Sequence, residues 1–129
     1  MVRILAMSIA IVVITIVIYF AYLFFTYIDA KHTEGEAYGF KIGDSKDIVY
    51  QKAQKVYDEE KVYILYPLDK NKYGPHKRIH LKSDEYQLIK NRDSWKLYFD
   101  EGFFDSMEFK FKDDTLISIY RHRKNFELP

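Results

Sequence analysis

Two histidines in the chain have a spacing that metal sites use. His76 and His80 stand in the i, i+4 relation of two zinc ligands on one face of a helix. Gly74 and Pro75 precede them, which disfavours a helix, and Lys77 stands where the His-Glu-x-x-His zinc motif has its glutamate. Two loop histidines are the simpler interpretation, so we expect no metal site.

A cluster of carboxylates is the second candidate for chemistry. Asp100, Glu101 and Asp105 could supply a pair of carboxylates for general acid–base catalysis. They flank Gly102, however, and this composition is more typical of a solvated loop. The chain has no Gly-x-Ser-x-Gly elbow and no glycine-rich phosphate loop, and it has no cysteine, which excludes thiol catalysis and thiolate metal sites.

We therefore predict that the protein is not an enzyme, with no catalytic or cofactor-binding residue, no cofactor and no small-molecule substrate. A small envelope hydrolase that uses Asp100, Asp105 or His122 remains the alternative from a different class.

Basic residues form two clusters that favour binding over catalysis. One lies around the segment 70–82, and the second is the run Arg121-His122-Arg123-Lys124. If the two clusters meet, they form a positive surface suited to an acidic protein partner or to anionic lipid headgroups. If they do not, both are ordinary solvated segments. The chain ends in an apolar-tipped tail that can dock on the sheet or on a partner's edge. The candidate partner-binding residues are Lys77, Arg78, Arg121, His122, Arg123 and Phe126.

The N-terminus reads as a membrane anchor. Ile4 to Ile28 contains no charged residue, no proline and no glycine, and about 20 apolar residues span a bilayer. A secretory signal peptide has an apolar region of only about 7–15 residues followed by a small-residue cleavage site. The one candidate site here, Ile28-Asp29-Ala30, fits poorly, so we predict an uncleaved signal anchor over residues 1–28.

The flanking charges bear on the direction of insertion. Arg3 precedes the apolar segment and Lys31 follows it, so the two ends differ little in Lys and Arg. The prediction therefore depends partly on the very short N-terminus, which most simply stays in the cytoplasm. We expect a single-pass protein of the inner (cytoplasmic) membrane whose folded domain is periplasmic.

The remainder is expected to be a tether over residues 29–39 and an extracytoplasmic α+β domain over residues 40–129. The formal net charge of only +1 argues against a nucleic-acid partner, which would require a strongly basic face. Asp44 or Ser45 can cap a helix over residues 45–58, in which Ile48, Val49, Ala53 and Val56 form an apolar stripe.

Strands are predicted at residues 61–66, 95–99, 106–111 and 115–120, with a short one at 79–81 and an exposed loop over 69–78. Residues 83–92 are ambiguous between helix and strand, with helix slightly favoured. Asp113-Asp114 joins two strands as a hairpin, and Met107, Phe109 and Phe111 alternate with charged residues. The expected fold is a helix packed on an antiparallel meander.

Two segments resemble a known family. Lys41-Ile42-Gly43-Asp44-Ser45-Lys46-Asp47-Ile48-Val49 is similar to the helix opening of the SmpA/OmlA small lipoproteins, the BamE-like fold. Trp95 with Tyr98, and then Phe111-Lys112-Asp113-Asp114-Thr115-Leu116, resemble that family's aromatic strand and closing hairpin. The resemblance covers roughly residues 40–122 and implies a helix layer on an antiparallel sheet, in envelope proteins that bind other proteins.

The chain departs from this family in two ways. A membrane helix replaces the family's lipidated cysteine, and the family's Gly-x-Pro is absent after the helix, where Val56-Tyr57-Asp58-Glu59 runs on. The assembly role of the family is therefore not transferred. The sequence predicts a membrane-anchored periplasmic protein-binding module, in its sharper form an immunity protein that inhibits a toxin. An accessory subunit of an envelope assembly is the alternative within the same class.

Overall fold

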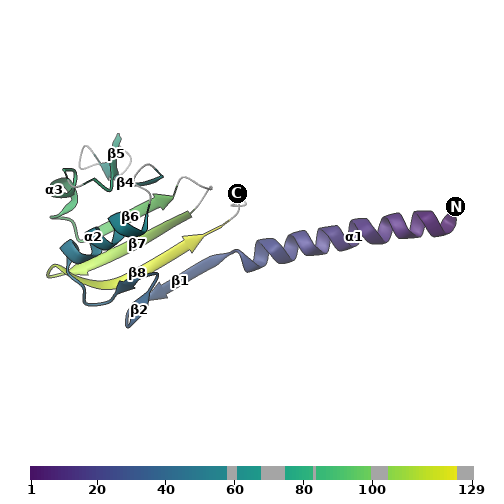
Figure 1. Ribbon diagram of the computed structural model, residues 1–129, viewed down its shortest axis with the longest axis horizontal. Helices are drawn as coiled ribbons and strands as arrows, with labels where there is room; N and C mark the ends of the chain where they lie inside the picture. Colours follow the sequence, from purple (N-terminus) through teal and green to yellow (C-terminus); the bar gives the residue numbers. More distant parts are fainter. Residues whose placement is uncertain (58–60, 68–74, 83, 100–104, 125–129) are drawn as a thin grey trace.

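The computed structural model of the protein describes residues 1–57, 61–67, 75–82, 84–99 and 105–124. The helices are α1 (Val2–Phe25), α2 (Lys46–Val56) and α3 (Tyr86–Ile89). The strands are β1 (Ile28–His32), β2 (Glu36–Ala37), β3 (Phe40–Lys41), β4 (Val62–Pro67), β5 (His76–His80), β6 (Ser94–Phe99), β7 (Asp105–Lys112) and β8 (Thr115–Arg123). Figure 1 shows α1 projecting from one end of the sheet.

The first helix has the length and composition to cross a membrane, as either an anchor or a signal sequence. Its 24 residues bury nothing inside the protein, which leaves the apolar side chains facing outward. The hydroxyls of Ser8 and Thr15 donate to the main-chain carbonyls of Ile4 and Ile11, one turn earlier. These polar groups are thus satisfied within the helix itself, as an apolar surrounding requires.

The sheet has six strands in the order β1-β8-β7-β6-β4-β5, and every neighbouring pair is antiparallel. The predicted meander β6-β7-β8 and its hairpin are confirmed. Asp113 and Asp114 have φ angles of 49° and 66°, the left-handed pair that a tight two-residue hairpin turn requires. A bulge separates Lys110 from Phe111 and leaves Ile117 without an opposite residue.

The segment predicted to be a tether is structured. Residues 28–32 form β1, which pairs along its whole length with β8, and residues 36–37 form β2, which pairs with β3. Only Thr26 and Tyr27 separate α1 from β1. The prediction for residues 29–39 differs from the structure because Asp29, Lys31, Glu34 and Glu36 look like a solvated linker. An edge strand exposed on one face accepts the same polar residues.

The second helix begins one residue after its predicted N-terminus, and its buried side differs from the predicted stripe. Ser45 caps it by accepting a hydrogen bond from the Ile48 amide. Ile48 and Val56 are exposed. The buried positions are Lys46, Val49, Tyr50 and Ala53, which repeat at helical spacing once a lysine and a tyrosine are allowed on the inner face.

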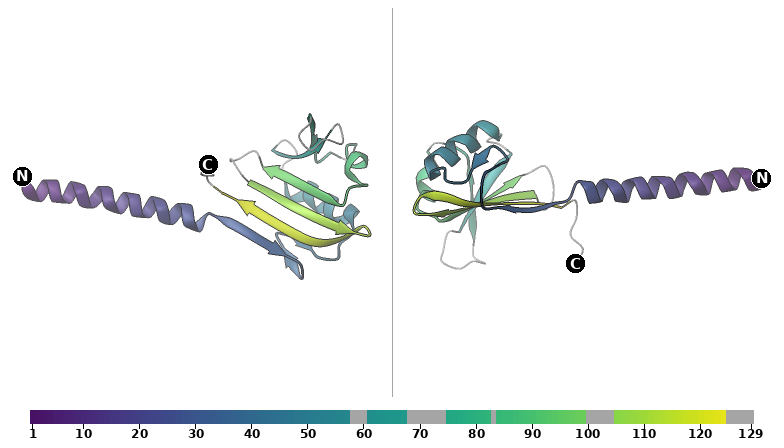
Figure 2. Two further views of the ribbon diagram at one scale, coloured as in Figure 1. Left: turned by 180° about the vertical axis from the view of Figure 1, so that it is seen from behind. Right: turned by 90° about the horizontal axis from the view of Figure 1, so that it is seen from below.

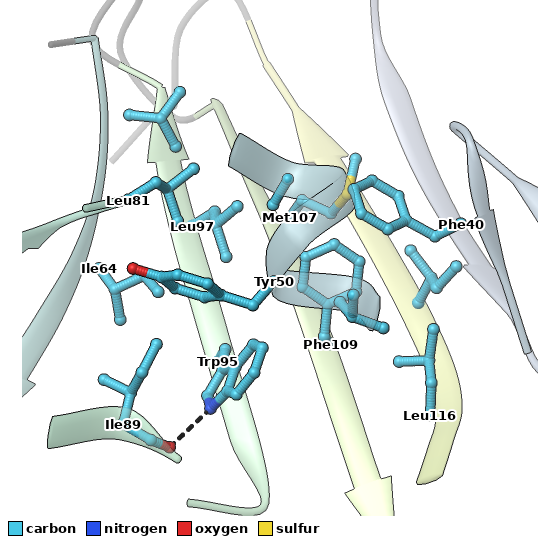
Figure 3. Packing of buried hydrophobic residues seen from close by; sticks show 14 of the residues in the cluster. Phe40, Tyr50, Ile64, Leu81, Ile89, Trp95, Leu97, Met107, Phe109 and Leu116 are labelled. Carbon is cyan, nitrogen blue, oxygen red and sulfur yellow. Dashed lines mark hydrogen bonds between the residues drawn. The ribbon is translucent and has the colours of Figure 1, made fainter. Parts of the chain in front are cut away.

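The buried cluster combines side chains of α2 and α3 with one face of the sheet. Figure 3 shows the Tyr50 ring between Leu97 and Trp95, and the centroids of the Tyr50 and Trp95 rings are 6.1 Å apart. The Trp95 indole N–H donates a 2.9 Å hydrogen bond to the Ile89 carbonyl. In Figure 2 (right), α2 lies on one side of the sheet. The predicted α+β class is consistent with these elements.

Two further predictions are refined by the structure. The ambiguous segment 83–92 contains the short helix α3 over residues 86–89, as slightly favoured. The strand expected at 79–81 is β5 over residues 76–80, so its first half falls inside the predicted loop. Histidine, lysine and arginine at its first three positions conceal the strand, since all three side chains are exposed. Residues 68–74 of that loop lie outside the described part of the chain.

Candidate partner-binding face of the sheet

Strand register divides the sheet into two chemically different faces, because successive side chains of a strand alternate between them. One row crosses all strands on the side of the buried cluster. Its members, in spatial order from β1 to β5, are Ala30, Arg121, Met107, Leu97, Ile64 and Ile79. The last four of these are buried. This inner face therefore needs no partner to cover it.

The adjacent row belongs to the opposite face, which we call the open face. Its members, again one from each strand from β1 to β5, are Asp29, His122, Ser106, Tyr98, Tyr63 and His80. A second row, from β1 to β6, contains Lys31, Tyr120, Glu108 and Lys96. A third contains Ser118, Lys110 and Ser94. The open face is thus made of aromatic, basic and small polar side chains, together with the two carboxylates Asp29 and Glu108.

Rings lie against one another along the open face. Tyr63 and Tyr98 are stacked with centroids 5.7 Å apart and planes inclined by 16°. Tyr120 and His122 stack at 6.2 Å. Arg78 lies 4.4 Å from the centroid of the Tyr63 ring. The stacked rings hold flat, partly exposed surfaces in defined positions.

Both acidic side chains of the open-face rows are engaged by hydroxyl groups. The Tyr120 and Tyr27 hydroxyls donate to the Asp29 carboxylate at 2.5 and 2.9 Å. These two hydrogen bonds, in that order of importance, hold the pKa of Asp29 below its ordinary value. Glu108 accepts a 2.8 Å hydrogen bond from the Ser94 hydroxyl. By formal charge, Lys31, Lys96, Lys110 and Arg78 outnumber these two carboxylates, so the open face is net cationic.

The structure separates the predicted partner-binding residues. Arg78 and His122 lie on the open face, and Arg123 is exposed at the end of β8. Lys77 has its ammonium group 3.4 Å from the Glu85 carboxylate. Arg121 points to the inner side, where it pairs with Asp105, donates to the Ser106 carbonyl and lies 4.7 Å from the Phe99 ring. Phe126 lies outside the described residues.

The described residues of the two basic clusters do not meet. β5 and the C-terminal half of β8 are separated by β7, β6 and β4 in the sheet, and neighbouring strands are about 4.8 Å apart. Arg121 is instead a structural residue, since its guanidinium bridges β8 and β7 with only 12% of the side chain exposed. The single positive surface that would join both clusters is therefore absent from the described strands.

The chemical candidates fare as follows. His76 and His80 are at the two ends of a strand and not on a helix. Within the described ranges, no group of three or more histidine, cysteine, aspartate or glutamate side chains could hold a metal ion. Asp105 is occupied by Arg121, and Asp100 and Glu101 lie outside the described residues.

The residues that the sequence analysis missed are the tyrosines and lysines of the open face. The sequence of residues 94–99 contains a signal for part of this face, because its polar and apolar residues alternate. In the structure Trp95 and Leu97 are buried, and Ser94 and Lys96 are exposed. That alternation places Tyr98 on the polar side despite its aromatic ring. No such alternation places Asp29 and Lys31 on the open face, because β1 was itself not predicted from the sequence.

Comparison with protein-family models, with curated proteins and with solved structures gave no match. The resemblance to the SmpA/OmlA family therefore stays a prediction.

Proposed function

We propose that the protein is a single-pass, membrane-anchored module of a cell envelope that binds another protein through the open face of its sheet. The observation that carries this proposal is the direct continuation of α1 into the sheet. β1 begins three residues after the helix ends and is itself part of the open face through Asp29 and Lys31. An aromatic and cationic surface is thereby presented at a fixed place beside the bilayer.

The uncleaved anchor is part of the same proposal. Removal of α1 at Ile28-Asp29-Ala30 would cut within β1, which forms five register pairs with β8. A retained helix keeps this edge strand intact. We further propose that the N-terminus is cytoplasmic and that the helix-covered sheet lies in the periplasm of an inner-membrane protein.

The sharper form of the function is an inhibitor or immunity protein that occupies a toxin acting in the periplasm. It is supported by the small size of the domain and by the exposed aromatic and cationic side chains of the open face. The accessory-subunit alternative uses the same face on a larger membrane assembly. No described residue cluster favours the hydrolase alternative, since Asp105 is engaged by Arg121.

The test is mild crosslinking of the full-length, affinity-tagged chain in its native membranes, followed by capture. One stoichiometric soluble partner supports the inhibitor role, and a set of membrane components supports the accessory-subunit role. No specific partner in either fraction would contradict the binding-module function. Thiol labelling of a Ser94→Cys variant in intact cells and in opened cells checks the periplasmic location, since Ser94 is exposed.

A further inference from the structure

We infer that the open face recognises an acidic polypeptide segment of the partner protein. This inference rests on the proposed function and adds to it the chemistry of the partner and the residues that select it. Within the described chain, the carriers of the selectivity are three exposed lysines, one each from β1, β6 and β7: Lys31, Lys96 and Lys110.

The charge balance of the open face indicates the sign of the charge on the partner's contact surface. The three lysines make no ion pair with another described residue, and they outnumber the two carboxylates of this face, Asp29 and Glu108. Arg78 adds a fourth cation over the Tyr63 ring. A cationic surface on a chain whose net charge is only +1 indicates a local requirement for an anionic partner.

The aromatic residues indicate a polypeptide partner. Tyrosine and arginine are enriched at protein–protein contacts, because rigid rings contribute large area at low entropic cost. The Tyr63–Tyr98 stack joins β4 and β6, and the Lys96 ammonium group lies 5.3 Å from the Tyr98 centroid. Flat rings bordered by lysines fit a segment that carries carboxylates and also has apolar atoms to pack.

The orientation of the sheet argues against anionic lipid as the occupant. Figure 2 (right) shows the sheet nearly edge-on and roughly in line with α1. If α1 crosses the bilayer, the plane of the sheet is roughly parallel to the membrane normal. The open face then cannot lie flat on the headgroups.

The experiment uses the full chain in nanodiscs of neutral phosphatidylcholine, with fluorescein-labelled poly-L-glutamate as the probe and anisotropy as the readout. The test variant is the triple substitution Lys31→Glu, Lys96→Glu and Lys110→Glu. The matched control is Lys41→Glu, Lys55→Glu and Lys82→Glu, which makes the same charge change at exposed lysines outside the open face. Lys96→Glu alone is a milder variant in case the test triple does not fold, as judged by Trp95 fluorescence.

We expect the test triple to bind poly-L-glutamate at least about tenfold more weakly than the control triple, or about 1.4 kcal/mol. Raising the ionic strength from about 0.01 to about 0.1 M should narrow that difference, because exposed charges are screened. Lys96→Glu alone should show a smaller loss in the same direction. Equal binding by both triples would overturn the inference. So would a preference of the wild type for phosphatidylglycerol vesicles over poly-L-glutamate that disappears in the test triple.

Failure of this inference is distinguishable from failure of the proposed function. If membrane capture yields a specific partner that the test triple retains at wild-type affinity, the binding-module function is supported. The inference that the open-face lysines bind this partner is then wrong. If the control triple retains that partner and the test triple loses it, the assignment is supported.

Discussion

The Tyr120 hydroxyl donates a 2.5 Å hydrogen bond to the carboxylate of Asp29, which lies 91 residues earlier in the chain. The other carboxylate oxygen accepts from Tyr27, one of the two residues between α1 and the sheet. The Asp29 side chain thus connects the residues that follow α1 with β1 and β8. The junction between α1 and the sheet is therefore fixed by side-chain contacts as well as by strand pairing.

This junction should respond to acid. Both hydroxyls stabilise the ionised form of Asp29, which lowers its pKa in the folded protein relative to the unfolded chain. The stabilisation is therefore fully present above the unfolded pKa, about 3.9, and is lost as the pH falls through the lower folded pKa. We expect Asp29→Asn to melt at a lower temperature than the wild type at pH 6, and the difference to shrink below about pH 3.

Thermal melts of both proteins across that pH range are the measurement. Glu108→Gln is the control, because its carboxylate accepts a hydrogen bond from Ser94 and is not hydrogen-bonded to Tyr27, Asp29 or Tyr120. A gap between Asp29→Asn and the wild type that widens on acidification would contradict the assigned role of Asp29.

A second prediction concerns where a soluble fragment can begin. A fragment starting at Ile28 keeps β1, whereas one starting at Gly35 loses it and leaves β8 as an unpaired edge. Since a backbone hydrogen bond contributes about 0.5–1.5 kcal/mol net, we expect the shorter fragment to be less stable by about 2 kcal/mol or more. Urea denaturation and size-exclusion chromatography would show this loss together with a tendency to associate. Equal stability of the two fragments would mean that β1 contributes nothing to the domain.

The parts of the fold that the sequence predicted are those in which local pattern and tertiary environment agree. Met107, Phe109 and Phe111 alternate with charged residues and are all buried. The Asp113-Asp114 turn has the left-handed backbone that its position between two strands requires. Local signals of this kind are sufficient for a hairpin, because its partner is next in the chain.

The missed parts depend on distant residues. β1 finds its partner in β8 at the other end of the chain, so nothing near Asp29 in sequence reveals it. The inner face of α2 contains Lys46. Its aliphatic stem can be buried because the carbonyl of Lys90, distant in sequence, accepts a hydrogen bond from its ammonium group. The open face was missed for the same reason, since it is a property of strand register and not of any single segment.

A third prediction tests the hydrogen bond inside the core. Trp95→Phe removes the donor to the buried Ile89 carbonyl and part of the ring that packs at 4.5 Å from the Phe111 centroid. We expect a loss of about 2–4 kcal/mol in the free energy of unfolding, from the lost hydrogen bond and from the cavity beside the smaller ring. The Ile89 carbonyl keeps a 3.0 Å hydrogen bond from the Arg92 amide. Urea denaturation followed by circular dichroism measures it, because the substitution removes the only tryptophan. Tyr98→Phe, on the open face, is the control and should cost less than about 1 kcal/mol.

The last prediction concerns Lys46, the buried cation of the described core. Its ammonium group donates to the Lys90 carbonyl at 3.1 Å and lies 3.6 Å from Asp93 and 3.5 Å from Asp114. The side chain is 5% exposed, whereas the two carboxylates are 83% and 60% exposed. Because water screens such carboxylates, the two ion pairs contribute little. The hydrogen bond to the carbonyl and the burial of the aliphatic stem should dominate.

This ranking gives an ordered series of variants. Lys46→Met keeps the stem and loses the charge-assisted hydrogen bond, so we expect a cost of about 1.5–3 kcal/mol in the free energy of unfolding. Lys46→Ala also removes the stem and should cost more. Asp93→Asn and Lys52→Met should each cost less than about 1 kcal/mol. Lys52 is 38% exposed and lies 2.7 Å from Asp44, which is 16% exposed. Urea denaturation distinguishes the two mechanisms. If Asp93→Asn is as damaging as Lys46→Met, the ion pairs hold α2 in place, and the carbonyl of Lys90 is not the principal partner of this lysine.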